Sequence, residues 1–171
     1  YYEPAGTEGA VNITINRIIH DYRNFYNMMN NRDECGTNVI CPEADPYEDE
    51  INSAAHLDMG GYICSAALIN NTSQDLTPYV LTADHCVQGE NPNNFTFYFD
   101  HKTSSCSGNS GNYSRSISGS DLKASRNMNS SDVALLQMDD TPPSWWDAYY
   151  AGWRRNTSAP TISAGIHHPG G

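Results

Sequence analysis

Short segments in which apolar and polar residues alternate run through the middle of the chain. The alternation is clearest in residues 94–101, where Phe95, Phe97 and Phe99 mark the buried face of a strand. The same pattern, or a short apolar run between turn residues, predicts further strands at 51–59, 62–70, 79–83 and 132–138, and a weak one near Leu122. No amphipathic helix is evident among them. Six short, regularly spaced strands predict an all-β fold, either an antiparallel barrel or a sandwich.

The strand pattern has clear limits at both ends. A Thr-Pro-Pro sequence at 141–143 ends the strand pattern, and an aromatic segment with a different pattern begins at Ser144. Residues 1–34 trail off into polar sequence after a short alternating stretch. We therefore interpret 1–34 as an N-terminal extension or propeptide remnant, 35–143 as a first β-barrel, and 144–171 as the truncated start of a second.

Composition narrows the classes of partner. The chain has 171 residues and a formal net charge of −11, which argues against nucleic acid and anionic membranes, because both need a basic face. No apolar run is long enough to span a bilayer. The chain begins at Tyr1 without a signal peptide, so we expect that a targeting segment has been removed or omitted. A secreted, extracellular protein is expected.

Cysteine content points the same way. The chain has five cysteines, and they lack the paired Cys-x-x-Cys spacing of a zinc site. Disulfide bonds are therefore the better interpretation, as is usual for secreted proteins. Because the number is odd, one cysteine has no partner within this chain. The five are Cys35, Cys41, Cys64, Cys86 and Cys106.

The first candidate for chemistry is His85, in the sequence YVLTADHC at 79–86. A short apolar run leads into a loop, where the histidine is followed at once by Cys86, which could anchor it. A general base has to lie within about 3 Å of the proton it takes, so it needs such anchoring. A lone histidine near the end of a strand is usually structural, and the case for His85 depends on its companions.

The second candidate is Asp132, which opens the strand sequence DVALLQM 47 residues after His85. A histidine that acts as a general base needs a rigid carboxylate that holds its tautomer and stabilises the imidazolium. The alternative is an Asx turn that only starts the strand. Asp84 is a poorer orienting group, because adjacent residues in an extended segment point in opposite directions.

These motifs carry a family resemblance. LTADHC and DVALL resemble the catalytic histidine and aspartate segments of trypsin-like serine proteases. Three further strings are similar to the lysyl-endopeptidase branch of that family: CGTNVICPEAD from Cys35, AGWRR from Ala151 and IHHPGG from Ile166. The resemblance implies the trypsin-like two-barrel fold, with the first barrel complete and the second only begun. It also implies that His85 and Asp132 are catalytic.

The resemblance departs from the family pattern at two positions and implies a disulfide scheme. Asp84 stands where the family usually has alanine, and Ala66 stands where YICSAALIN would have glycine. The scheme joins Cys64 to Cys86, which holds the histidine loop, and Cys41 to Cys106. Cys35 is then unpaired in this chain and bridges to a segment outside it.

The nucleophile is not evident. Ser110, in GNSGN, looks like the serine motif of these enzymes, but it lies between His85 and Asp132, whereas the family order is His, Asp, Ser. We expect the serine, the oxyanion hole and the specificity pocket in a missing C-terminal half beyond Gly171, so the chain alone should be inactive. His167 and His168 face opposite sides of an extended segment and rarely chelate together. No metal or cofactor is expected.

The leading hypothesis is a secreted serine endopeptidase that acts on proteins or peptides and cuts after lysine, or after lysine and arginine. The chain contains two lysines and seven arginines, as selection against self-cleavage at lysine would produce, although an acidic, Asn-rich composition is the simpler explanation. The alternative is a non-catalytic relative that keeps the barrel and binds another protein. The residue at the missing serine position would separate the two.

Overall fold

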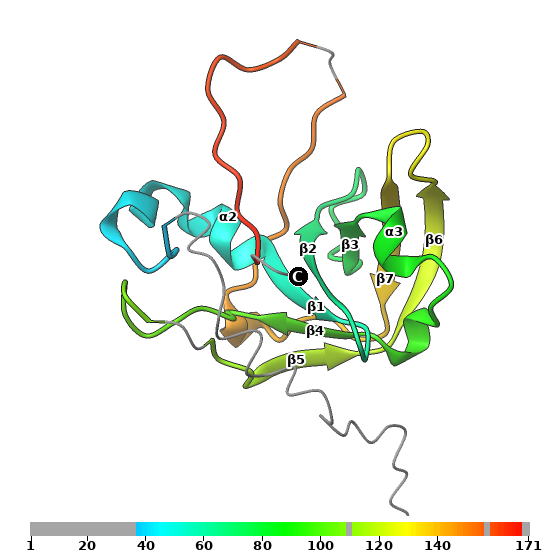
Figure 1. Ribbon diagram of the computed structural model, residues 1–171, viewed down its shortest axis with the longest axis horizontal. Coiled ribbons are helices and arrows are strands. Elements are labelled where there is room, and N and C mark those ends of the chain that lie inside the picture. Colours follow the sequence, from blue (N-terminus) through cyan, green and yellow to red (C-terminus); the bar gives the residue numbers. More distant parts are fainter. Residues whose placement is uncertain (1–36, 109–110, 156–157, 169–171) are drawn as a thin grey trace, which may run out of the picture.

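A computed structural model describes residues 37–108, 111–155 and 158–168. These residues form an all-β protein with a few short helices (Figure 1). The strands are β1 (Ala54–Asp58), β2 (Ile63–Ile69), β3 (Tyr79–Thr82), β4 (Thr96–Phe99), β5 (Arg115–Ser118), β6 (Ser120–Arg126) and β7 (Val133–Met138). The helices are η1 (Pro42–Tyr47), α2 (Glu48–Ser53), α3 (Asp84–Val87), η2 (Pro92–Asn94) and η3 (Ser144–Trp146).

All seven strands belong to one antiparallel sheet with the order β5-β4-β1-β2-β3-β7-β6. The predicted all-β fold is confirmed. β1 pairs with β2, which follows it across a short connection that contains Gly60 and Gly61. The pairing of β3 with β7 joins segments that lie far apart in the sequence, and it brings the candidate site together.

Gly119 shows that the sheet curves into a barrel. It is the only residue between β5 and β6, which occupy opposite edges of the sheet, so the two edges must approach each other there. Its φ of +89° is favourable only for glycine, and a Cβ at this position would collide with the carboxylate of Asp139. Its backbone also forms two hydrogen bonds. The N–H of Gly119 donates to Phe95 O at 2.8 Å, just before β4, and its carbonyl oxygen accepts from the N–H of Asp139 at 3.1 Å, just after β7.

Alternate residues of the strands fill the barrel. Phe95, Phe97 and Phe99 are at most 2% exposed, as their alternation predicted. They pack with residues from every other part of the sheet, and burying such side chains provides most of the stabilisation, at about 1.5–3 kcal/mol each. The other core members include Ala55, Leu57, Leu68, Val80, Ile117, Ala134, Leu136 and Met138.

The structure corrects three details of the sequence interpretation. The segment predicted as a strand from residue 51 begins as α2, and β1 starts only at Ala54. Residues 84–87 form the short helix α3 instead of a loop. A seventh strand, β5, lies in a segment for which the sequence predicts no strand, and only one of its side chains, Ile117, is buried. Each segment is short, so local pattern alone gives little signal for it.

The segment that follows η3 crosses the end of the sheet. Trp146 packs on Phe99, and Ala151 pairs with Ile69 at the end of β2 in a parallel bridge. Residues 152–155 and 158–168 extend outward as a long loop (Figure 1), and the backbone N–H of His168 returns to donate to Ser65 Oγ at 2.9 Å. The predicted start of a second barrel at 144 remains a prediction, and residues 1–36 lie outside the described residues.

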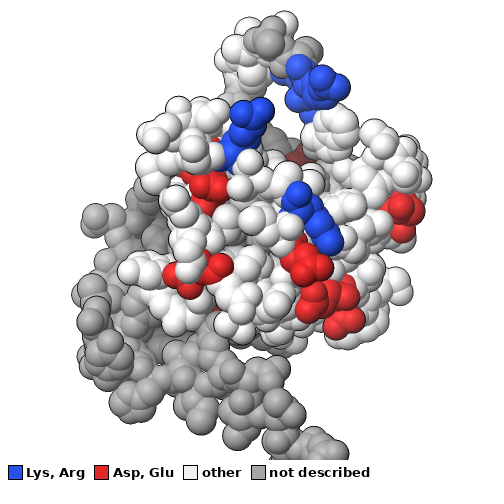
Figure 2. Space-filling model, turned by 90° about the vertical axis from the view of Figure 1, so that its right-hand side faces the viewer, with Lys and Arg blue, Asp and Glu red and all other residues white. Residues whose placement is uncertain are grey.

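Acidic side chains outnumber basic ones on the surface. On the face that includes α3 and β6, Figure 2 shows acidic groups at several separate places and few basic ones. Within the part of the chain that the structure describes, no helix is long and apolar enough to cross a membrane.

Candidate active site

The pairing of β3 with β7 places the two candidate residues side by side. Thr82, the last residue of β3, is the register partner of Ala134 near the start of β7. In an antiparallel pair, the residues that follow one strand lie beside those that precede the other. His85 follows β3 in α3, and Asp132 immediately precedes β7, so both side chains lie at the same edge of the barrel.

Their side chains are in direct contact. His85 Nδ1 lies 2.7 Å from Asp132 Oδ2, and the backbone N–H of His85 donates to Asp132 Oδ1 at 2.9 Å. The contact that the sequence predicted is therefore present. The histidine side chain is 51% exposed and that of the aspartate 31%. The carboxylate thus holds the ring by one nitrogen while half of the ring remains accessible to a reactant.

The backbone of Asp132 is shaped for this contact. Its φ is +46°, a left-handed conformation that aspartate tolerates better than most residues, and its N–H donates to Asn127 O at 3.2 Å. This turn aims the carboxylate back toward α3. The Asx-turn alternative would have left the side chain bonded within its own turn, whereas both oxygens bond to His85.

Hydrogen bonds to the charged carboxylate favour ionisation of Asp132. The backbone N–H of His85, then its side chain, lower the pKa of Asp132 below the ordinary carboxyl value, with smaller contributions from the charge of His85 and the backbone N–H of Asp84. An ionised carboxylate beside Nδ1 keeps the proton on that nitrogen and leaves Nε2 free to accept one.

The disulfide between Cys64 and Cys86 anchors the histidine. It joins β2 to α3, one residue after His85, across a sequence separation of 22. A second disulfide joins Cys41, ahead of η1, to Cys106 across a separation of 65. Both pairs are those that the family resemblance implied. Cys35 lies outside the described residues, so its role as the unpaired cysteine remains a prediction.

Two other parts of the sequence interpretation concern Ser110 and the histidine pair at 167–168. Ser110 lies outside the described residues, so its exclusion as nucleophile still depends on chain order. His167 is exposed, and the ring of the neighbouring His168 packs instead against His56 and His101, with centroid separations of 5.4 and 5.5 Å.

One group of potential metal ligands occurs in the described part of the chain. It comprises Cys64, His85 and Cys86. The two cysteines are joined as a disulfide and cannot coordinate a metal as thiolates. His56, His101 and His168 form a tight cluster but do not present converging ligand atoms.

Sequence reasoning missed the burial of two polar residues. His56 on β1 is 1% exposed and stacks near His101, at a centroid separation of 4.6 Å. Asp84 is 6% exposed although its side chain is a carboxyl group. The sequence offered one signal for Asp84, its departure from the alanine that is usual in the family that the motif resembles.

The fold and this site define an all-β, disulfide-bonded protein with a histidine–carboxylate pair at a strand edge. Residues 29–171 match the family model described as "Lysyl endopeptidase, C-terminal domain". Because the match covers most of the chain, the chain belongs to this family and is a protease-related protein. Two disulfides and membership of this family are typical of extracellular proteins.

Proposed function

We propose that the protein is a secreted serine endopeptidase of the trypsin-like type. His85 is the general base, and Asp132 orients it and stabilises the imidazolium. The observation that carries the proposal is the 2.7 Å contact between His85 Nδ1 and Asp132 Oδ2. Family membership supports a peptidase, and the half-exposed ring of His85 supports access by a substrate.

In the proposed mechanism a serine attacks the peptide carbonyl carbon, and His85 Nε2 takes its proton. The tetrahedral intermediate then collapses, and His85 passes the proton to the leaving amine. Water, deprotonated by His85, then attacks the acyl-enzyme, which releases the carboxylic acid product and returns the proton to the serine. The serine and the oxyanion hole are expected on a segment beyond Gly171, so the proposed activity belongs to the longer protein. No metal or cofactor takes part.

We further propose cleavage after lysine. The chain has only two lysines, and each lies near an aspartate: Lys102 Nζ is 2.8 Å from Asp100 Oδ1, and Lys123 Nζ is 3.4 Å from Asp121 Oδ2. A protease that cuts after lysine gains from having few accessible lysines. Seven arginines remain in the same chain, which favours lysine over general basic specificity.

Peptide hydrolysis by the full-length protein tests the proposal. We expect a higher kcat/KM for a lysyl peptide than for the matched arginyl peptide, and inactivation by a serine-directed fluorophosphonate. His85→Ala should lose both peptide cleavage and reaction with the fluorophosphonate. Asp140→Asn, an exposed carboxylate near the end of β7, is the matched control. Equal rates on the two peptides would remove the lysine preference, and no hydrolysis by a folded full-length protein would leave the non-catalytic binding module.

A further inference from the structure

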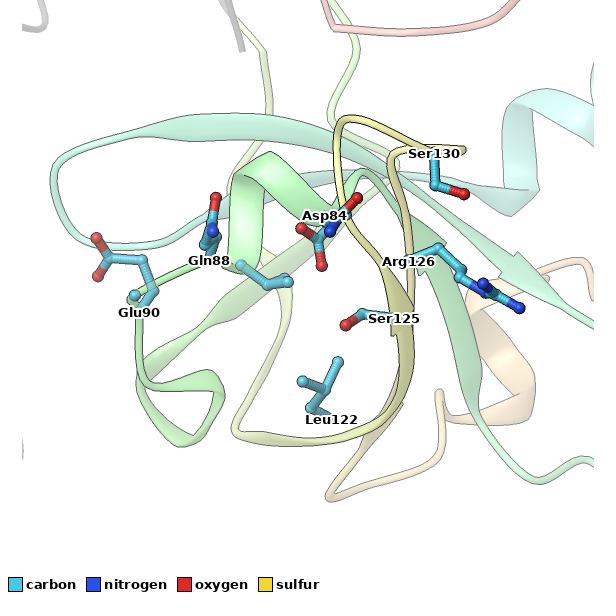
Figure 3. A pocket seen from close by; sticks show the side chains of 10 residues that line it. Asp84, Gln88, Glu90, Leu122, Ser125, Arg126 and Ser130 are labelled. Carbon is cyan, nitrogen blue, oxygen red and sulfur yellow. The ribbon is translucent and has the colours of Figure 1, made fainter.

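A pocket of about 640 Å³ opens between α3 and β6, next to the candidate pair but separate from it (Figure 3). Val87 and Leu122 contribute apolar walls. Ser125 and Ser130 contribute hydroxyls, and Glu90 contributes a carboxylate. The pocket also includes Asp84, the residue that immediately precedes His85. It is therefore built from the same helix as the proposed base.

Asp84 is a buried residue whose carboxyl group has no counter-charge within the part of the chain that the structure describes. The residue is 6% exposed, and among the described residues its side chain has no hydrogen-bond or ion-pair partner. Figure 3 shows the carboxylate directed into the space between α3 and β6, while the side chain of Arg126 points away from it. A cation in the pocket would give this carboxyl group the counter-charge that it lacks.

The shape and lining of the pocket indicate what kind of cation fits. Its volume greatly exceeds that of a bare ion, and the described residues place no set of three ligands there for a metal. A long basic side chain matches it better, since its alkyl stem can lie against Val87 and Leu122 while its head reaches Asp84. The serine hydroxyls can accept further hydrogen bonds from an ammonium or guanidinium group.

We propose that this pocket is a subsite for a basic side chain of the polypeptide substrate, at a position that flanks the cleaved residue. The proposal rests on the proposed endopeptidase function, because α3 carries both Asp84 and the base His85. The net charge of −11 attracts a basic side chain, and few basic groups on this face oppose that attraction (Figure 2).

The first test measures substrate preference with the full-length protein. Peptides share one cleaved lysine, and each flanking position in turn carries lysine, arginine or the neutral isostere norleucine. We expect one position at which a basic residue raises kcat/KM about tenfold over norleucine, and Asp84→Asn should bring that ratio close to one. Asp140→Asn should keep it. The absence of a preferred position, or an unchanged ratio in Asp84→Asn, would overturn the subsite.

A second variant covers the case in which Asp84→Asn does not fold. Ser125 is exposed on β6, so Ser125→Phe places a ring into the pocket without disturbing the core. It should lower the ratio in the same way, and Ser125→Ala, which leaves the pocket open, should preserve it. A ratio that survives the phenylalanine would contradict the proposal.

A binding readout separates failure of the subsite from failure of the proposed function. Nα-acetyl-lysine amide is titrated into the full-length protein while the amide resonances of Ser125 and Ser130 are followed by NMR. We expect saturable shifts that the norleucine analogue does not produce and that Asp84→Asn abolishes. Shifts in a protein that hydrolyses no peptide would keep the cation pocket and reject the protease. Peptide hydrolysis with neither NMR shifts nor a preferred flanking position would keep the protease and reject the cation pocket.

Discussion

The carboxylate of Asp132 holds His85 at two places, its backbone N–H at 2.9 Å and its ring Nδ1 at 2.7 Å. The first contact fixes where α3 begins relative to β7, and the second fixes the ring. Position and orientation of the histidine therefore depend on one side chain. The following predictions test what each contact contributes.

Asp132→Asn should keep the backbone contact and spoil the ring contact. Its amide oxygen can still accept the N–H of His85, but its amide nitrogen would face Nδ1 and favour the wrong tautomer. In the full-length protein we expect kcat to fall about 10⁴-fold, as for the equivalent change in trypsin-like triads. Asp140→Asn controls for charge, and a loss smaller than tenfold would reject the orienting role.

The pKa of Asp132 should respond only partly to loss of the histidine ring. His85→Ala removes the side-chain hydrogen bond and the charge but retains the backbone N–H, the largest cause of the lowered pKa. We expect a ¹³C NMR titration to show the pKa of Asp132 below the ordinary value in the wild type and raised part of the way in the variant. A full return to the ordinary value would show that the backbone contact contributes nothing.

The lowered pKa also sets a pH dependence of stability. A carboxyl whose pKa is lower in the folded state stabilises that state above its unfolded pKa, about 3.9, and loses the effect as pH falls through its folded pKa. The difference in melting temperature between wild type and Asp132→Ala should thus be constant near neutral pH and shrink below about pH 4. A difference that grows on acidification would contradict the assignment.

The two disulfides should differ in what their loss affects. From loop length, removing Cys41–Cys106 should cost about 4 kcal/mol of unfolding free energy and removing Cys64–Cys86 about 3 kcal/mol. Only the second holds α3, so only the Cys64→Ala/Cys86→Ala variant should lose activity out of proportion to its stability. Denaturation and peptide hydrolysis on both double variants check this. The prediction fails if the larger loss of activity follows the first pair.

Gly119→Ala should destabilise the barrel. The substitution places a side chain at a φ of +89° and against the Asp139 carboxylate, at an expected cost of about 2 kcal/mol or more. Gly61→Ala is the matched control, because its Cβ would meet no atom within 4 Å. Chemical denaturation should separate the two variants. Equal stabilities would mean that the corner does not constrain the sheet.

Much of the fold, and the choice of His85 and Asp132 as candidates, followed from local sequence. The alternating phenylalanines of β4 show the period of a strand directly, and Asp132 stands at the start of an unmistakable apolar run. The contact itself needed the family resemblance, since nothing local pairs β3 with β7. The disulfide partners came from the resemblance as well.

Other features depend on tertiary structure and left no local trace. β5 is polar apart from Ile117, because one of its faces is solvated and it lies at the sheet edge. α2 has six residues, too few for a helical period to show. The burial of Asp84 and His56 depends on which elements pack over them, so a sequence in which charged and polar residues usually lie outside could not predict it.

The pairing of β3 with β7 also determines when the site can exist during synthesis. His85 emerges from the ribosome well before Asp132, and the two meet only after Val133–Met138 has paired with Tyr79–Thr82. Such non-local pairing closes a long loop and is slow compared with hairpin formation. A nascent or partly folded chain therefore carries an unoriented histidine, and the order of folding itself delays assembly of the pair until these two strands of the barrel have paired.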